Sequence, residues 1–182
     1  VYEQEVPSGH SASDYVTERF FITSHDGVEV PVTILRKADT PVDGSAPLFV
    51  YGYGSYGIPM GASFNTNRLS LVDRGMIYAT AHIRGGSDMG RSWYLDGKLD
   101  KKLNTFKDFI AVTEALCERG YGTKGQVASM GGSAGGMLMG GIMNMRPDLF
   151  KAIVASVPFV DVLSTILDDS LPLTPGEWTE WG

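Results

Sequence analysis

One serine in this chain has the sequence surroundings of a nucleophile. Residues 131–135 read Gly-Gly-Ser-Ala-Gly, so Ser133 lies at the centre of a Gly-x-Ser-x-Gly pattern. An apolar run, Val127–Met130, precedes this pattern, and a second apolar run, Ala134–Met145, follows it. A strand, this pattern and a helix in that order predict a sharp turn that lifts the serine hydroxyl above the sheet edge. A serine held in this way can attack an acyl carbon and form a covalent acyl-enzyme.

The same serine also suits a simpler role as the cap of the helix. Serine is a favoured N-cap residue, whose hydroxyl accepts a hydrogen bond from a backbone N–H group of the first turn. The chain contains 23 glycines, so a short glycine-rich pattern around a serine can arise by chance. The elements before and after Ser133 therefore have to decide between a nucleophile and a cap.

A nucleophilic serine needs hydrogen-bond donors for the oxyanion that forms when it attacks. One predicted donor is the backbone N–H of Ala134, because the first N–H groups of a helix have no partner inside the helix. A second donor is expected from the loop after the apolar run Leu48–Tyr51. This loop, residues 51–57, reads Tyr-Gly-Tyr-Gly-Ser-Tyr-Gly and offers tyrosine hydroxyls.

The serine also needs a general base and an acid that orients the base. The three histidines, His10, His25 and His82, all precede Ser133, whereas enzymes with this turn have the order serine, acid, histidine. We expect His82, at the end of a predicted strand, to be hydrogen-bonded in the core. Asp161 is expected to cap a short helix. No complete triad can be assembled from these residues, so the chain is either a fragment of an enzyme, which its abrupt end favours, or a non-catalytic relative.

The elements that must position these residues follow a regular order. Two β-rich runs, Arg19–Ser24 and Val28–Arg36, flank Asp26-Gly27 and predict a β-hairpin. The apolar patterns then predict strands at 48–51, 76–83, 127–130 and 152–157, and helices at 64–73, 106–119 and 134–145. This order predicts a partial α/β-hydrolase fold, in which an antiparallel hairpin leads into a doubly wound parallel sheet. Such sheets bind ligands at the carboxyl ends of their strands, where segments 51–57, 84–90 and 131–136 are expected to meet.

Three local patterns refine this prediction. Residues 1–17 have the composition of a lead-in or linker, which leaves residues 18–182 as one hydrolase domain. Thr105 and Asp108 form a capping-box pattern at the start of the predicted helix 106–119. The run 152–157 is continuous and apolar, as in a strand that is buried on both faces.

Composition excludes several classes of function. The chain has 182 residues, 43% hydrophobic and 20% charged, which is ordinary for one soluble globular domain. Its net charge of −6 argues against nucleic acid or an anionic membrane as a partner. A single cysteine, Cys117, excludes an internal disulfide and suits a reducing compartment. The histidines and the cysteine lack the spacing of metal ligands, and we expect no metal and no other cofactor.

Several segments together resemble one enzyme family. The segments Tyr51–Gly57, Ile83–Gly86, Asn104–Phe109 and Met130–Gly136 resemble the prolyl oligopeptidase family. Met130–Gly136 and Pro172–Trp178 are most similar to its oligopeptidase B branch (protease II). The resemblance runs from about residue 14 to residue 182, nearly the whole chain.

The resemblance implies a cytosolic serine peptidase that cleaves short peptides after arginine or lysine. It implies that Ser133 is the nucleophile and that the Tyr53 hydroxyl and the Ala134 N–H hold the oxyanion. It places Arg84 with the substrate-binding residues, where we expect it to organise the site through hydrogen bonds to backbone carbonyl groups. It also implies a β-propeller before this chain, and the aspartate and histidine of the triad after it.

The resemblance further implies a pocket for the basic side chain of the substrate. Its residues lie in the segment Gly176–Gly182, with Glu177 as the principal carboxylate and Trp178 beside it. Relatives carry a second acidic residue two positions further on, where this chain has Thr179. We expect this segment to be extended, so that its side chains alternate and Glu180 points away from Glu177.

Two other readings stay open at this point. The same fold and nucleophile would serve a carboxylesterase or an acyl-aminoacyl peptidase. A truncated hydrolase fold could also act in binding alone, without catalysis.

Overall fold

The computed structural model describes residue 6 and residues 9–61 and 63–182. In these residues six strands form one sheet in the order β1-β2-β4-β3-β5-β6. The strands are β1 (Tyr15–Thr23), β2 (Glu29–Lys37), β3 (Leu48–Tyr51), β4 (Ile77–Ala81), β5 (Val127–Gly132) and β6 (Phe150–Ser156). The pairs β1–β2 and β2–β4 are antiparallel, and β4, β3, β5 and β6 are parallel. The predicted antiparallel hairpin and parallel sheet are confirmed.

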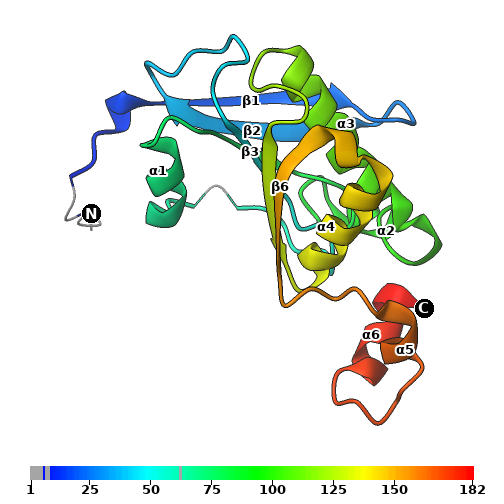
Figure 1. The fold of residues 1–182 in the computed structure, drawn as a ribbon. Coiled ribbons are helices and arrows are strands. Elements are labelled where there is room, and N and C mark those ends of the chain that lie inside the picture. The colour runs from blue at the N-terminus through cyan, green and yellow to red at the C-terminus, as the bar shows by residue number, and fades with distance from the viewer. Residues whose placement is uncertain (1–5, 7–8, 62) are drawn as a thin grey trace.

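The helices cover both faces of this sheet. They are α1 (Thr66–Val72), α2 (Arg91–Leu95), α3 (Leu103–Glu118), α4 (Ala134–Met145), α5 (Val162–Ile166) and α6 (Thr174–Trp181), with short 3₁₀ turns η1 (Ala12–Asp14), η2 (Leu99–Lys101) and η3 (Pro147–Leu149). Figure 1 shows α1 on one face and α3 and α4 on the other. Parallel strands are joined by right-handed crossovers, so the direction of each crossover decides which face its helix covers. The chain moves along the sheet in one direction from β3 to β4 and in the opposite direction from β4 to β5, so α1 and α3 cover opposite faces.

The hairpin between β1 and β2 forms where the sequence predicts it. Gly27 adopts φ 84°, and the N–H of Ser24 donates to the carbonyl oxygen of Val28 (2.8 Å). The first strand, however, begins at Tyr15. The end of the predicted lead-in 1–17 therefore belongs to the sheet, while residues 1–5 and 7–8 of that lead-in lie outside the described residues.

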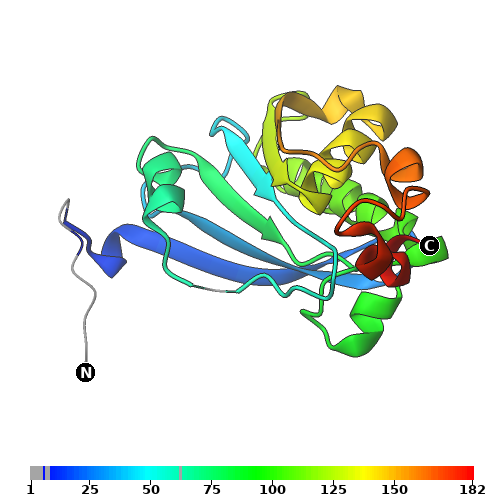
Figure 2. The ribbon, with the colours of Figure 1, turned by 90° about the horizontal axis from the view of Figure 1, so that it is seen from below.

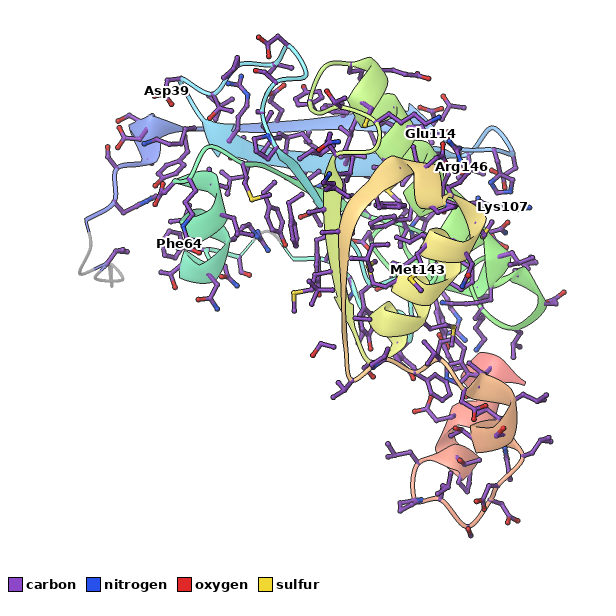
Figure 3. The ribbon with its side chains drawn as sticks, in the orientation of Figure 1. Asp39, Phe64, Lys107, Glu114, Met143 and Arg146 are labelled. Atoms are coloured by element: carbon purple, nitrogen blue, oxygen red, sulfur yellow. The ribbon has the colours of Figure 1, made fainter. Side chains whose placement is uncertain are left out.

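The core lies between the sheet and the helices α3 and α4. All five residues of β4 are buried, as expected for a strand that is covered on both faces. The largest side chains that the two helices bury are Phe109, Leu116, Leu138, Met139 and Ile142. Near the carboxyl ends of α3 and α4, Glu114 and Arg146 form an ion pair that joins the two helices (Figure 3).

The last strand and the third helix differ from their predictions. β6 is largely exposed rather than buried, with Val154 52% exposed, because it forms the edge of the sheet. α3 begins at Leu103, so Thr105 and Asp108 lie inside its first turns and do not form a capping box. Both side chains instead bond to Arg84, Thr105 to its carbonyl oxygen (2.8 Å) and Asp108 to its guanidinium (2.6 Å). The helix ends as predicted, with Gly120 at φ 82°.

The helices α5 and α6 form a small lobe at the carboxyl end of β6 (Figure 2). Asp161 caps α5 as predicted, because its carboxylate accepts a hydrogen bond from the N–H of Ser164 (3.3 Å). The segment 174–181 is helical, so the predicted extended conformation is wrong. Among the described residues no helix has the length and apolar character needed to cross a bilayer.

Candidate active site

The order of the parallel strands reverses direction at β3. The chain leaves β3 for its neighbour β4 and later returns on the other side of β3 as β5. Ligands of doubly wound sheets bind at the carboxyl end of the strands where the order reverses in this way. The segments 52–57 and 133–136 follow β3 and β5 at that point, so topology alone brings Tyr53 and Ser133 to the same edge.

Ser133 occupies a sharp turn between β5 and α4. Its backbone has φ 55° and ψ −121°, and its side chain is exposed. A residue other than glycine in such a region costs about 1–3 kcal/mol, so neighbouring contacts have to hold it. The Ser133 N–H donates to the Ser156 carbonyl oxygen (3.1 Å), and the Ser133 carbonyl oxygen accepts from the Phe159 N–H (2.9 Å). The side chain makes no capping hydrogen bond to α4, which excludes the cap and confirms the predicted turn.

The glycines around Ser133 let three segments pass close together. A Cβ atom on Gly131 would lie 2.1 Å from the carbonyl oxygen of Gly135. A Cβ atom on Gly136 would lie 2.5 Å from the Cα of Pro158. A side chain at either position would push α4 away from the strand or from the segment after β6, and the turn could not keep its shape.

The predicted oxyanion donors lie beside the serine. Ala134 is the first residue of α4, so its N–H has no acceptor within the helix. The Tyr53 ring lies against the same helix end, since a Cβ atom on Gly135 would be 3.2 Å from Tyr53 Cδ2. Burial raises the pKa of the Tyr53 hydroxyl, and the nearby Ser133 side chain opposes part of that rise. The hydroxyl therefore stays protonated at neutral pH and can donate next to the nucleophile.

The loop that carries Tyr53 is fixed by the loop after β4. The Gly57 N–H donates to the Gly85 carbonyl oxygen (2.9 Å), and Ser87 Oγ donates to the Gly57 carbonyl oxygen (2.6 Å). The backbones are in direct contact, because a Cβ atom on Gly85 would lie 2.0 Å from the carbonyl oxygen of Gly54. The segments 51–57 and 84–90 therefore meet, as the sequence predicts.

A cavity of about 360 Å³ opens beside Ser133. Its walls come from Tyr56, from the segment after β6 and from the α5–α6 lobe. The residues that line it are Tyr56, Ser133, Val157, Pro158, Phe159, Thr165, Ile166, Leu171, Pro172, Leu173, Thr174 and Glu177. Within the described part of the chain, Glu177 is the one ionised side chain in this lining.

Two donors hold the Glu177 carboxylate at the cavity wall. Its Oε2 accepts hydrogen bonds from the Tyr56 hydroxyl (2.7 Å) and from Trp181 Nε1 (2.8 Å). Burial and the bond to Glu177 raise the pKa of Tyr56, so its hydroxyl remains a donor. Among the described residues, the second oxygen, Oε1, accepts no hydrogen bond and is left for a ligand.

Glu180 lies on the same side of α6 as Glu177, so its predicted orientation is wrong. Residues three apart share a face of a helix, whereas the prediction assumed an extended segment. Glu180 is 2% exposed, and its carboxylate accepts from the Tyr56 N–H (2.8 Å) and the Tyr94 hydroxyl (2.6 Å). Pro175, in the first turn of α6, is the signal that could have predicted this helix.

The prolyl oligopeptidase family model matches residues 62–182 of the chain. The chain belongs to this family. Dipeptidyl aminopeptidase BI from Pseudoxanthomonas mexicana is 54% identical over 99% of the chain, which covers 25% of that protein. Protease 2 from Moraxella lacunata is 47% identical over 97% of the chain, which covers 26% of that protein. The chain thus spans about a quarter of the length of these relatives.

Solved structures agree with this assignment. Oligopeptidase B from Leishmania major superposes with a TM-score of 0.94 at 50% identity, over 98% of this chain and 25% of that chain. Oligopeptidase B from Trypanosoma brucei with covalently bound antipain gives a TM-score of 0.95 at 49% identity, over 98% of this chain and 25% of that chain. The predicted α/β-hydrolase fold and the resemblance to oligopeptidase B are confirmed.

Arg84 and Trp178, which were predicted to bind substrate, make hydrogen bonds within the protein. Arg84 was expected to bond backbone carbonyl groups, but its guanidinium donates to the carboxylates of Asp26 (2.6 Å) and Asp108 (2.6 Å). It is 3% exposed, so its burial argues against direct contact with substrate. Trp178 is half-exposed, and its Nε1 donates to the Ile166 carbonyl oxygen (3.1 Å). A substrate contact for either residue stays a prediction.

His82 has the structural role that the sequence predicts. Its Nδ1 lies 2.7 Å from Asp88 Oδ1, and its Nε2 lies 2.9 Å from Thr33 Oγ1. The imidazole is buried, with both ring nitrogens engaged. These contacts leave neither nitrogen free to accept a proton from Ser133.

Proposed function

We propose that this chain is the nucleophile-bearing part of a serine oligopeptidase that cleaves short peptides after arginine or lysine. The observation that carries the proposal is the position of Ser133. Its exposed hydroxyl sits on a strained turn, on the side of the helix end where the Tyr53 ring packs, and lines a cavity whose ionised lining residue is Glu177. Membership of the prolyl oligopeptidase family supports this function.

Acylation would use the groups at the turn in fixed roles. Ser133 Oγ attacks the carbonyl carbon of the scissile bond while a general base takes the hydroxyl proton. The carbonyl electron pair moves to oxygen, and the oxyanion accepts hydrogen bonds from the Ala134 N–H and the Tyr53 hydroxyl. The C–N bond then breaks, the amine leaves with the proton returned by the base, and the acyl group stays on Ser133. Water repeats the sequence and releases the acid.

Glu177 would select the basic side chain. A guanidinium or ammonium group in the cavity can donate charge-assisted hydrogen bonds to its free oxygen. The apolar side chains of the lining suit the aliphatic stem of arginine or lysine. Thr179 stands where the resemblance to the family implies a second acid, so one carboxylate has to provide most of the selectivity.

We further propose that the groups missing from this chain belong to the rest of the same protein. The relatives are about four times longer than the match, which leaves room for a propeller domain before it and for the triad aspartate and histidine after it. A propeller would restrict substrates to short peptides. The proposed compartment is the cytoplasm, in keeping with a single cysteine.

Steady-state kinetics of the full-length protein test this function. An arginyl amide and a matched leucyl amide serve as substrates, and a fluorophosphonate reports on the nucleophile. Ser133→Ala should abolish turnover and labelling. Glu177→Gln should lower kcat/KM for the arginyl amide about 10- to 100-fold, as expected for a lost bond to a charged group, and leave the leucyl amide unchanged. An equal decrease in kcat/KM for both substrates would show that Glu177 does not select the basic side chain.

A carboxylesterase or acyl-aminoacyl peptidase is the second candidate. Apart from Glu177, the cavity lining is uncharged in the described residues, which favours neutral acyl groups. Faster turnover of a neutral ester or an acetyl-aminoacyl amide than of the arginyl amide would select this function. A protein that binds peptides but is not labelled at Ser133 would be a binding protein of the same fold.

A further inference from the structure

Lys102 points its ammonium group into the protein, toward the loop that carries Tyr53. The residue lies between η2 and α3. Its Nζ donates to the Gly54 carbonyl oxygen, to Ser55 Oγ (2.9 Å) and to the Gly97 carbonyl oxygen (3.2 Å). Gly54 and Ser55 directly follow Tyr53, so this contact acts on the backbone next to the proposed oxyanion donor.

The helix α6 holds the same loop from the other end. Glu180 accepts a hydrogen bond from the Tyr56 N–H, and Glu177 accepts one from the Tyr56 hydroxyl. Trp181 connects the two sides, because its ring centroid lies 5.1 Å from Lys102 Nζ and its Nε1 donates to Glu177. One cation and one buried carboxylate thus fix the segment between them.

We propose that Lys102 and Glu180 are positioning residues, which hold loop 53–57 so that the Tyr53 hydroxyl stays beside Ser133. The proposal rests on the proposed role of Ser133 as the nucleophile. Neither residue touches the reacting atoms. Their effect is on the place of the oxyanion donor, where a displacement of about 1 Å can cost 10²-fold in rate.

The contacts of Lys102 need its charged form. An ammonium group has three N–H donors, and Lys102 has three oxygen acceptors. A neutral amine has two donors and a lone pair, so deprotonation would turn that lone pair toward one of these oxygens. Loss of the proton would therefore release one end of the loop.

The environment of Lys102 brings this proton loss close to physiological pH. Burial lowers the pKa of Lys102 to about 8, and the negative charge of Glu180 opposes this shift. Two further titratable groups lie on the Glu180 side of this cluster. Tyr94, in α2, donates its hydroxyl hydrogen bond to Glu180, and Lys98, after α2, donates to the Tyr94 hydroxyl (3.0 Å). The described residues that α4 and the β6–α5 segment contribute to the cavity beside Lys102 are uncharged. Glu180 is thus the carboxylate that favours the charged form of Lys102 against the effect of burial.

The sign of the pH effect follows from these partners. The protonated, competent form dominates below about pH 8 and is lost as pH rises through that value. Turnover should therefore fall on the alkaline side. Removal of the Glu180 charge should move this fall to lower pH, because the group that opposes the effect of burial is gone.

The test compares four variants of the full-length protein with wild type between pH 6 and pH 10. The readouts are kcat for the arginyl amide and the rate of Ser133 labelling by a fluorophosphonate. Lys102→Arg, which stays charged, should remove the alkaline fall. Glu180→Gln should shift it to lower pH. Lys102→Met should give a flat alkaline profile and lower kcat about 10- to 100-fold at pH 7. This drop in kcat should not exceed the loss expected when an oxyanion donor is missing.

The neighbouring residue provides a matched control. Lys101 is half-exposed and pairs with Asp96 at the surface (2.7 Å), so Lys101→Met should keep the wild-type rate and profile. The proposal is overturned if Lys102→Arg keeps the wild-type alkaline fall, or if Glu180→Gln leaves its midpoint in place. These two variants keep the test valid even where Lys102→Met does not fold. Labelling of Ser133 without cleavage of the arginyl amide would refute the proposed substrate, and the pH profile of labelling would still decide the role of Lys102.

Discussion

Replacement of Asp108 by asparagine should strongly destabilise the catalytic domain. The Asp108 side chain is fully buried, and its carboxylate accepts hydrogen bonds from Ser24 Oγ (2.6 Å) and from Arg84 Nε (2.8 Å) and Nη2 (2.6 Å). Arg84 is itself buried, and its other carboxylate partner is Asp26, whose side chain is 34% exposed. These three side chains join the β1–β2 turn, the loop after β4 and α3.

The size of the effect follows from what Asp108→Asn leaves behind. The asparagine amide can accept fewer of these bonds, and its NH₂ group opposes the guanidinium. Removing one partner of a buried ion pair costs about 3–5 kcal/mol, because the other charge stays buried without compensation. Asp26 still neutralises part of the Arg84 charge, so we expect about 3 kcal/mol. This is a large share of a total stability of about 5–15 kcal/mol.

Denaturant unfolding of the full-length protein measures this loss as a lower midpoint of the catalytic-domain transition at an unchanged slope. Asp26→Asn is the matched control and should cost about 1 kcal/mol or less, because its side chain is partly exposed and screened. The double variant Arg84→Met/Asp108→Leu should regain most of the stability, since apolar residues of similar volume often replace a buried pair without loss. Equal effects of Asp108→Asn and Asp26→Asn would refute this reasoning.

Two further predictions concern the site itself. Tyr53→Phe should lower kcat about 10²- to 10³-fold with little change in KM, because the ring keeps its place against Gly135 while the donor is lost; a kcat within a few-fold of wild type would exclude Tyr53 from the oxyanion site. His82→Asn should keep kcat within about tenfold and lower stability by about 1–3 kcal/mol, because the imidazole bonds Thr33 and Asp88 in the core; complete loss of turnover in a folded variant would identify His82 as the base.

The turn at Ser133 and the hairpin at Gly27 were predictable because residues close in sequence determine both. Each depends on a residue that the backbone holds at positive φ and on a few neighbours in sequence. Gly27 tolerates that region by lacking a Cβ atom. The strained serine was recognisable because a strand, small residues and a helix surround it. Neither prediction required knowledge of distant partners.

The exposure of β6 could not be predicted in this way. Its apolar run has the composition of a buried strand, but burial depends on what lies beside the strand. In the described residues β6 pairs with β5 alone, so one edge stays open. A run of apolar residues predicts that a strand forms, but it does not predict whether the strand lies in the centre or at the edge of the sheet.

The pattern Thr105-x-x-Asp108 illustrates a conflict between a local and a distant partner. A capping box and a buried anchor for an arginine have the same residue types and the same spacing. The cation of Arg84 decides between them, because a buried guanidinium needs carboxylates more than a helix end needs a cap. The helix therefore starts earlier, at Leu103, and carries both side chains into the core.

Glu177 and Glu180 show how two carboxylates on one helix face acquire different roles. Glu180 is fully buried, its bonds go to the backbone of Tyr56 and to the Tyr94 hydroxyl, and its charge faces Lys102. Such an anion is already compensated and has nothing to offer a ligand. Glu177 is partly exposed, and its two bonds from neutral donors orient it without neutralising its charge. The uncompensated charge is the one that lines the cavity, so a cationic side chain gains most by binding there. Glu180→Gln should accordingly act on rate through the loop, whereas Glu177→Gln should act on the choice of substrate.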